Sequence, residues 1–169
     1  ELTIKGKMAN LIHETHCLAM TDFMYDLCLL NDLSVNQIVG ILSIFTNIRV
    51  SDEIKQITPN CDAYLKDKIL KLVDLCKDYE DYEINNYISS PIDTHNLTYD
   101  IISECVEWCN SDNELQCKNI LKELNDEKEI FLGEFVKALL KINNISSELE
   151  SVCELYGNVE LLSKLKQIP

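Results

Sequence analysis

Only 4 glycines and 3 prolines interrupt the 169 residues of this chain. Sandwiches and barrels need many tight turns, which glycine and proline supply, so a chain this poor in both residues favours long helices. Apolar residues also recur at the spacing of one helix face, as at Leu65, Ile69, Leu72 and Cys76. The length is sufficient for a buried core without disulfides or metals. We therefore expect an all-α fold, a bundle of six to seven helices that forms a single helical domain over residues 1–169.

Capping residues and breaks divide the chain into seven expected helices. They cover, approximately, residues 18–30, 34–45, 60–79, 97–109, 113–124, 126–156 and 159–168. Ser34 and Gln37 have the spacing of a capping box, and Gly157 is placed to end the long sixth helix. The acidic run after Lys77 is expected to be a solvated helix end, because carboxylates are unfavourable near a helix C-terminus. Ser-Ser-Pro at residues 89–91 is expected to break the chain.

The first seven residues have a different pattern. Leu2 and Ile4 alternate with polar residues, as in a short strand. A single strand needs a partner, so we interpret residues 1–7 as a strand-like segment that connects to domains upstream. The chain starts at Glu1 rather than at methionine, and we accordingly expect it to be a fragment or a processed product.

The net charge is −14, from 29 acidic and 15 basic residues. A field of this sign repels polyanions, which argues against a protein that binds nucleic acid over its whole surface. A local basic stripe remains compatible with this charge. The sequence has no run of about 18 uncharged apolar residues, so we expect no membrane span.

The 8 cysteines fall mostly on apolar helix faces. Free cysteine is among the most buried residue types, and disulfides are rare in the cytosol and nucleus. We therefore favour reduced core thiols over disulfides, and expect an intracellular protein in the reducing environment of the nucleus or cytoplasm.

The segment His13-x-x-His16-Cys17 is the best candidate for a metal site, with Cys105 and Cys109 available as further ligands. Because no second ligand pair completes such a site in the sequence, we favour a polar helix start with buried thiols, and no metal. A phosphate-binding loop, a dinucleotide fingerprint and a hydrolase elbow are all missing from the sequence. No catalytic residue is predicted.

A helical projection of residues 126–156 places Lys137, Lys141, Asn144 and Glu148 in one narrow polar stripe. Most of the large apolar residues lie about 120° away from this stripe. The plain interpretation is a central bundle helix with a solvated polar seam. The functional one is that the stripe contacts a nucleic-acid strand, with the two lysines on phosphates and Asn144 on a base edge or a 2′-hydroxyl.

Val136 and Leu140 form a second, smaller apolar patch on the other side of the stripe. A surface helix normally has a single apolar face, so two patches indicate a helix that packs on two sides.

Five segments, in order, are similar to those of a known family. They are Ile4–Ala9, Asn31–Ile38 followed by Leu42–Phe45, Trp108-Cys109, Ile130–Lys137, and Gly157–Leu161. The chain thereby resembles the DSHCT domain, the C-terminal helical domain of DExH RNA helicases of the Ski/Mtr type, which are cofactors of the RNA exosome. Each segment is short, but their order and spacing match the family over most of the chain.

The resemblance implies an accessory domain of an ATP-dependent superfamily 2 RNA helicase, of which this chain would be a C-terminal fragment. Val136 and Leu140 would then be a docking surface for the upstream domains. ATP and Mg²⁺ would bind to RecA-like motor domains outside this chain, which would itself hold no cofactor and no catalytic residue. The long helix would correspond to a ratchet-like helix beside the path of single-stranded RNA, with Lys137, Lys141 and Asn144 as RNA-binding residues. The implied partners are single-stranded RNA, the upstream motor domains and RNA-decay machinery of the exosome type.

The chain departs from the family at the positions that matter most. Lys137 and Lys141 stand where the family has arginine, and Asn144 stands where it has glutamate. Lysine keeps the charge but lacks the planar fork that grips a phosphate. A helical protein–protein interaction module without RNA contact is the alternative function, since the acidic balance fits it equally well.

Overall fold

The computed structural model describes residues 1–89 and 92–168. Within these ranges it contains eight α-helices and no strand, which confirms the all-α prediction. The α-helices are α1 (Ile4–Ala9), α2 (Cys17–Thr21), α3 (Val35–Leu42), α4 (Ala63–Asn85), α5 (Ile102–Cys109), α6 (Glu114–Lys128), α7 (Leu132–Tyr156) and α8 (Val159–Leu165). Three shorter elements are the π-helical η1 (Asp22–Asp26) and the 3-10 helices η2 (Ser43–Phe45) and η3 (Thr94–Asn96).

The prediction of a strand-like N-terminal segment is wrong, because α1 occupies that part of the chain. Thr3 caps the helix, and its hydroxyl oxygen accepts a hydrogen bond from the backbone N–H of Gly6 at 3.1 Å. This cap is a local signal that the alternation of Leu2 and Ile4 obscured. Lys5 then reaches across to η1, where its Nζ lies 2.6 Å from oxygens of both Asp22 and Asp26.

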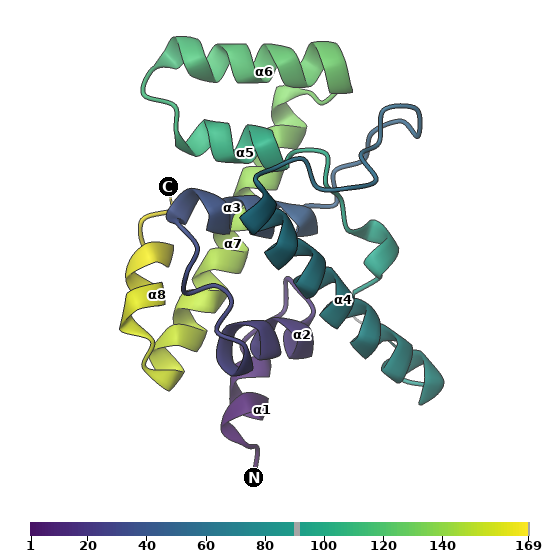
Figure 1. Cartoon of the computed structure of the whole chain (residues 1–169), viewed down its shortest axis with the longest axis vertical. Helices are drawn as coiled ribbons and strands as arrows, with labels where there is room; N and C mark the ends of the chain where they lie inside the picture. Colours follow the sequence, from purple (N-terminus) through teal and green to yellow (C-terminus); the bar gives the residue numbers. More distant parts are fainter. Residues whose placement is uncertain (90–91, 169) are drawn as a thin grey trace.

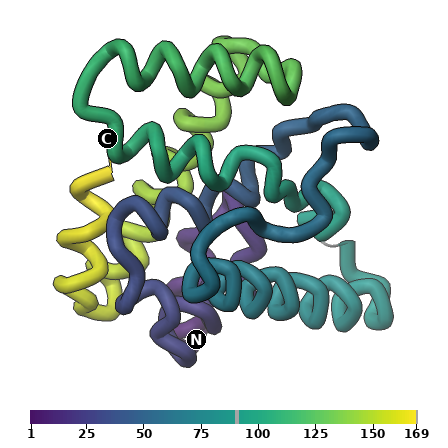
Figure 2. The backbone as a smooth tube through the Cα atoms, turned by 45° about the horizontal axis from the view of Figure 1, so that its top comes forward, coloured from purple at the N-terminus to yellow at the C-terminus, as the bar shows by residue number. Residues whose placement is uncertain are grey.

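The long helix α7 runs through the molecule behind α3 and α5, from the level of α6 to the turn into α8 (Figure 1). α8 packs back against α7, and α3 contacts α4, α5, α7 and α8. Figure 2 shows that α8 and the far end of α4 lie on opposite sides of the bundle. The irregular connection between η2 and α4 lies on the same side as the segment that leads into α5 (Figures 1 and 2).

Helix α3 can lie close to its neighbours because it has a glycine at the crossing. A Cβ atom built on Gly40 would lie 3.0 Å from a methyl group of Val106 on α5 and 3.1 Å from one of Leu65 on α4. Any larger side chain would push these helices apart, since packed interiors leave little free space.

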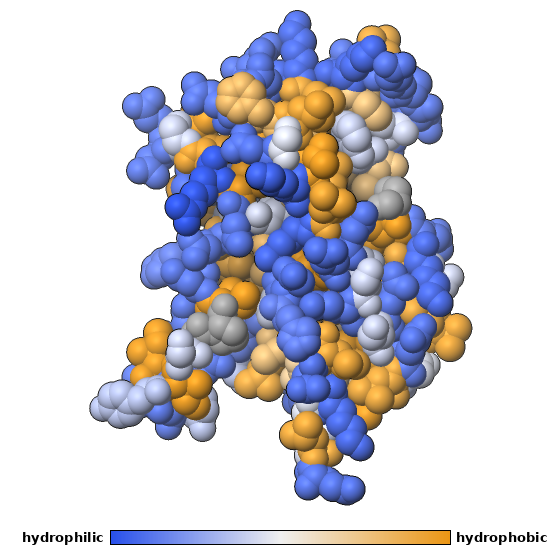
Figure 3. Space-filling model, turned by 180° about the vertical axis from the view of Figure 1, so that it is seen from behind, coloured by the Kyte–Doolittle hydropathy of each residue, from blue (hydrophilic) through white to orange (hydrophobic). Residues whose placement is uncertain are grey.

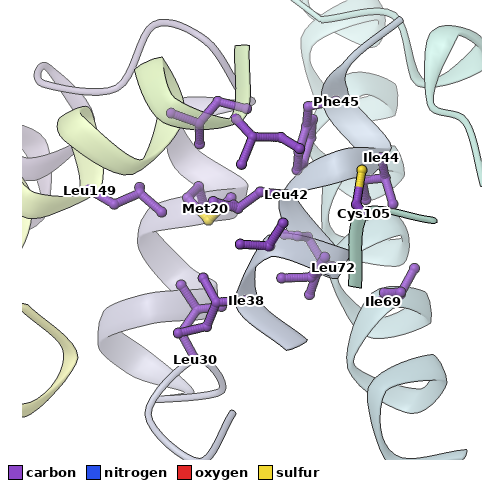
Figure 4. Close-up of a cluster of buried hydrophobic side chains, with 14 of the residues drawn as sticks. Met20, Leu30, Ile38, Leu42, Ile44, Phe45, Ile69, Leu72, Cys105 and Leu149 are labelled. Carbon is purple, nitrogen blue, oxygen red and sulfur yellow. The ribbon is translucent and has the colours of Figure 1, made fainter. Parts of the chain in front are cut away.

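The core is one cluster to which nearly all the helices contribute. Figure 4 shows side chains from several helices that converge on this cluster, among them Met20, Leu30, Ile38, Leu42, Leu72 and Leu149. Each of these six side chains is fully buried. The core fixes the rotation of α7 about its own axis, and thereby the direction in which the polar residues of α7 point.

Several predicted boundaries shift for identifiable reasons. The helix expected over 18–30 ends at Asp26, and Cys28 follows with a left-handed backbone (φ 49°). The acidic run predicted to be a solvated end is helical to Asn85, because Glu83 turns inward and is 8% exposed. The sixth helix starts at Leu132 rather than near residue 126, since Glu129 adopts φ 57° and ends α6.

Two predicted caps are confirmed. Ser34 and Gln37 form a reciprocal capping box at the start of α3. Gly157 ends α7 with φ 81°, a conformation that glycine adopts without steric cost. The break expected at Ser-Ser-Pro can be followed only to residue 89, since residues 90 and 91 lie outside the described residues.

Candidate nucleic-acid interface on α7

The buried face of α7 orients the predicted stripe. Phe135, Ala138, Ile142, Ile145 and Leu149 are each at most 1% exposed. Because successive residues of a helix are rotated by about 100°, the stripe projects away from this face.

Lys137 and Asn144 are exposed, whereas Lys141 is only half-exposed. The Nζ of Lys141 lies 2.8 Å from a carboxylate oxygen of Glu14, in the loop before α2. Over residues 1–89 and 92–168, no ion pair or hydrogen bond joins Lys137 or the side chain of Asn144 to another residue. The structure therefore brings the three predicted site residues to one face of α7 and pairs only the middle one.

Glu148, the fourth residue of the stripe, holds the same loop. Its Oε2 accepts hydrogen bonds from the backbone N–H groups of His13, at 3.0 Å, and Glu14, at 3.1 Å. This contact fixes the loop where the Glu14 side chain can reach Lys141. Sequence reasoning missed Glu14, since no local pattern links it to a helix so far along the chain.

A small cleft of about 100 Å³ lies beside Lys141. Glu14, Phe45, Asn47 and Asn96 are among the residues that line it. Phe45 is 3% exposed and belongs to the hydrophobic core, whereas the two asparagine side chains are exposed. The end of the stripe that carries Lys141 thus opens onto polar groups from three other segments.

The second apolar patch is also present on α7. Val136 is 43% exposed and Leu140 is 57% exposed, and Phe131 and Leu132 at the start of the helix are more exposed still. Figure 3 shows the molecule from behind, with an apolar band that runs down from its upper part. Leu140 is one turn from Val136, so the two side chains form one continuous apolar surface next to Lys137.

The candidate metal ligands do not come together. His16 is fully buried: its Nδ1 accepts from the backbone N–H of Ala19 at 3.4 Å, and its Nε2 lies 3.4 Å from Glu83. The ring of His16 also stacks on that of Tyr79, with 5.5 Å between centroids. Among residues 1–89 and 92–168, no three histidine, cysteine, aspartate or glutamate side chains are placed to hold a metal ion. His16 joins α2 to α4 as a structural residue.

All eight cysteines are free thiols in the described structure. Cys76, Cys105 and Cys153 are fully buried. Burial raises the pKa of the Cys76 thiol to about 12 and that of Cys153 to about 11, and it raises the pKa of Cys105 as well. A buried thiol with a raised pKa is unreactive, because the thiolate is the nucleophile.

The whole-chain comparison decides the family. The model of the DSHCT (NUC185) domain matches residues 1–168. The chain belongs to the DSHCT domain family. A search of curated proteins found no match.

DSHCT domains are found in DExH-type helicases, and the match is consistent with an accessory domain of such a helicase. The resemblance drawn from the five sequence segments is therefore confirmed at the level of the family. In the part of the DSHCT domain that the structure describes, no helix is both long enough and apolar enough to cross a membrane.

Proposed function

We propose that this DSHCT domain guides single-stranded RNA along α7 and braces the motor domains of an ATP-dependent RNA helicase. ATP and Mg²⁺ bind to RecA-like domains outside this chain, which therefore carries no catalytic residue and no cofactor. The protein works in the nucleus or cytoplasm, where its free thiols stay reduced, and it serves RNA-decay machinery of the exosome type.

One observation carries the RNA contact: Lys137 and Asn144 point out from the same face of α7 and have no partner within the described ranges. A lysine ammonium attracts a backbone phosphate, and an asparagine amide can bond a base edge or a 2′-hydroxyl. Lys141 adds a second charge one turn away from Lys137. Three polar groups of this kind would bind a strand with little sequence specificity.

The apolar surface of Val136 and Leu140 supports the bracing role. These side chains lie beside the proposed strand path, on a helix whose opposite face is fixed by the core. A motor domain packed on them would hold α7 at a constant position relative to the RNA.

A protein–protein interaction module without RNA contact is the second candidate. The net charge of −14 favours it, because the overall field repels an RNA strand. The exposed apolar residues on α7 would then be the whole binding surface, and Lys137 would be an ordinary solvated lysine.

Binding to a fluorescent single-stranded RNA, measured by anisotropy at low salt, separates the two candidates. The double variant Lys137→Ala with Lys141→Ala should bind several-fold more weakly and with a shallower salt dependence, by about 0.7 in slope for each phosphate that is no longer neutralised. The matched control is Lys77→Ala with Lys122→Ala, which removes two exposed lysines from α4 and α6. Equal binding by both double variants would contradict the proposal, as would no binding by the unmodified domain.

A further inference from the structure

A second, larger cavity adjoins the cleft beside Lys141. It encloses about 340 Å³, a volume typical of a ligand site. One wall is the connection after η2, residues 47–55, and the other is the segment 95–100 that includes the end of η3. Asn47, Asn96 and Leu97 line both the cavity and the cleft, so the two hollows are neighbours, and we call them together the groove.

Hydrogen bonds hold the two walls together at both ends. The backbone N–H of Thr98 donates to the carbonyl of Ile44 at 3.1 Å. The backbone N–H of Gln56 donates to Asp100 at 2.7 Å, and the Thr98 hydroxyl donates to the other oxygen of Asp100 at 2.6 Å. The groove is therefore a preformed feature, and a ligand would not have to order it.

Asn47 makes the sharp turn at the mouth of the groove. It follows η2 and has φ 58°, in the left-handed region that asparagine tolerates better than most residues. This turn directs Ile48 and Val50 to the groove, where they are half-buried next to the buried Leu97. The groove consequently has apolar surface between its polar edges.

Of the exposed charged side chains that line the cavity, two are positive and one is negative. Arg49 and Lys55 are exposed, and over residues 1–89 and 92–168 neither is joined to a carboxylate by an ion pair. Of the acidic residues, Asp100 is 2% exposed and already accepts the two hydrogen bonds above. Asp52 opposes the two cations with an exposed carboxylate, and Glu14 and Asp93 line the adjoining cleft.

We propose that this groove is a second phosphate-binding subsite for the RNA strand, with Arg49 and Lys55 as its cationic residues. The inference rests on the proposed function, because the strand enters the groove from Lys141. Arg49 is the only arginine of the chain, and its planar guanidinium suits bidentate contact with a phosphate. The apolar surface of Ile48, Val50 and Leu97 gives a base a face to pack on.

The groove suits a strand better than a free nucleotide. Arg49 and Lys55 would bind the phosphate of a free nucleotide as well as that of a strand, because the chemistry is the same. Only a strand, however, is long enough to bind in the cavity and in the cleft at Lys141 at the same time. We therefore expect binding to depend on the length of the RNA.

Amide chemical shifts of the isotope-labelled chain, titrated with oligouridine of about ten nucleotides, test this directly, because they detect weak binding residue by residue. We expect shifts in residues 47–55 and 95–98 as well as in 137–144. In Arg49→Ala with Lys55→Ala the groove shifts should disappear while the α7 shifts persist. Lys77→Ala with Lys122→Ala, which changes the net charge equally, should retain both sets.

The outcomes separate the two levels of the proposal. Shifts confined to residues 137–144 would overturn the groove and leave the proposed function intact. Shifts in neither region would overturn both. Uridine monophosphate, added alone, should shift the groove much more weakly than the oligomer at the same phosphate concentration. An equal effect of the monophosphate would also overturn the inference, because the groove would then be a site for free nucleotides.

Discussion

The Nζ atom of Lys141 lies 2.8 Å from a carboxylate oxygen of Glu14, and both side chains are about one-third exposed. The ion pair engages Lys141, which lies between the exposed Lys137 and the groove. An RNA phosphate at this point must compete with a carboxylate of the protein itself. Glu14 is therefore a residue that weakens RNA binding in our account.

Replacement of Glu14 by glutamine should strengthen RNA binding by the domain. A partly exposed ion pair contributes up to about 1 kcal/mol, so we expect a gain of no more than about fivefold in affinity. Anisotropy with a labelled single-stranded RNA measures it. Glu127→Gln, at an exposed position on α6, changes the net charge equally and should have a much smaller effect. If both variants gained the same affinity for RNA, the cause would be the change in net charge and not the loss of the ion pair.

Trp108 is a half-buried residue that matters for stability. Its ring packs edge-on against the buried Phe135 on α7, with 5.3 Å between centroids. Trp108→Ala should lower the free energy of unfolding by about 2–3 kcal/mol, which is less than for a fully buried large aromatic residue. Tyr87→Ala is the control, because that side chain is 99% exposed and should change stability by less than about 0.5 kcal/mol. A urea melt in which both variants resemble the unmodified domain would show that the Trp108 contact is not stabilising.

Asp22 links stability to pH. Burial opposes its ionisation, but hydrogen bonds from Lys5 and Tyr79 outweigh burial and hold the pKa of this carboxyl below its ordinary value of 3.8. A carboxyl with a depressed folded-state pKa adds stability above its unfolded pKa and loses that contribution as the pH falls through the folded one.

Asp22→Asn should therefore destabilise the domain by about 1–3 kcal/mol at neutral pH. Urea melts across the acid range should show the gap to the unmodified domain narrowing once the pH drops below about 4. Asp67→Asn is a suitable control, since Asp67 is an exposed residue of α4 that pairs with the exposed Lys71, one turn away. A gap that stayed constant with pH would refute the role given to Asp22.

The thiols should differ in reactivity in a predictable order. Cys28 is exposed, whereas Cys76, Cys105 and Cys153 are buried with raised pKa values. At about pH 8 a thiol reagent should modify Cys28 first and leave the three buried cysteines unmodified until the domain unfolds. Peptide mapping after a short exposure identifies the modified residue. Early labelling of Cys105 would contradict the packing of α5.

The helices could largely be predicted because their signals are local. The capping box at Ser34 and Gln37 and the glycine after α7 act within a few residues of where they stand, and both are found as expected. The start of α7 could not be predicted this way, because Glu129 ends α6 in a left-handed conformation that its residue type does not indicate. Nor could α1, since two apolar residues two apart fit a strand as well as a helix end.

The candidate site was predictable only in part. Periodicity placed Lys137, Lys141 and Asn144 on one face of a helix, which is a local property. The pairing of Lys141 with Glu14 and the groove between the connection after η2 and the segment before α5 depend on contacts between distant parts of the chain. Such contacts depend on how the helices pack, and they cannot be predicted from the spacing of residues in the sequence.

Duplex unwinding by the proposed helicase, of which this domain would be part, is the most direct test of the central claim, that α7 guides the RNA strand. Lys137→Ala with Lys141→Ala should reduce the unwinding rate by roughly three- to tenfold, as expected when phosphate binding weakens by about 1 kcal/mol. ATP hydrolysis without RNA should stay the same, and the stability of the protein should fall by no more than about 1 kcal/mol, the contribution of the ion pair between Lys141 and Glu14. Unwinding at low salt equal to that of Lys77→Ala with Lys122→Ala would contradict the account.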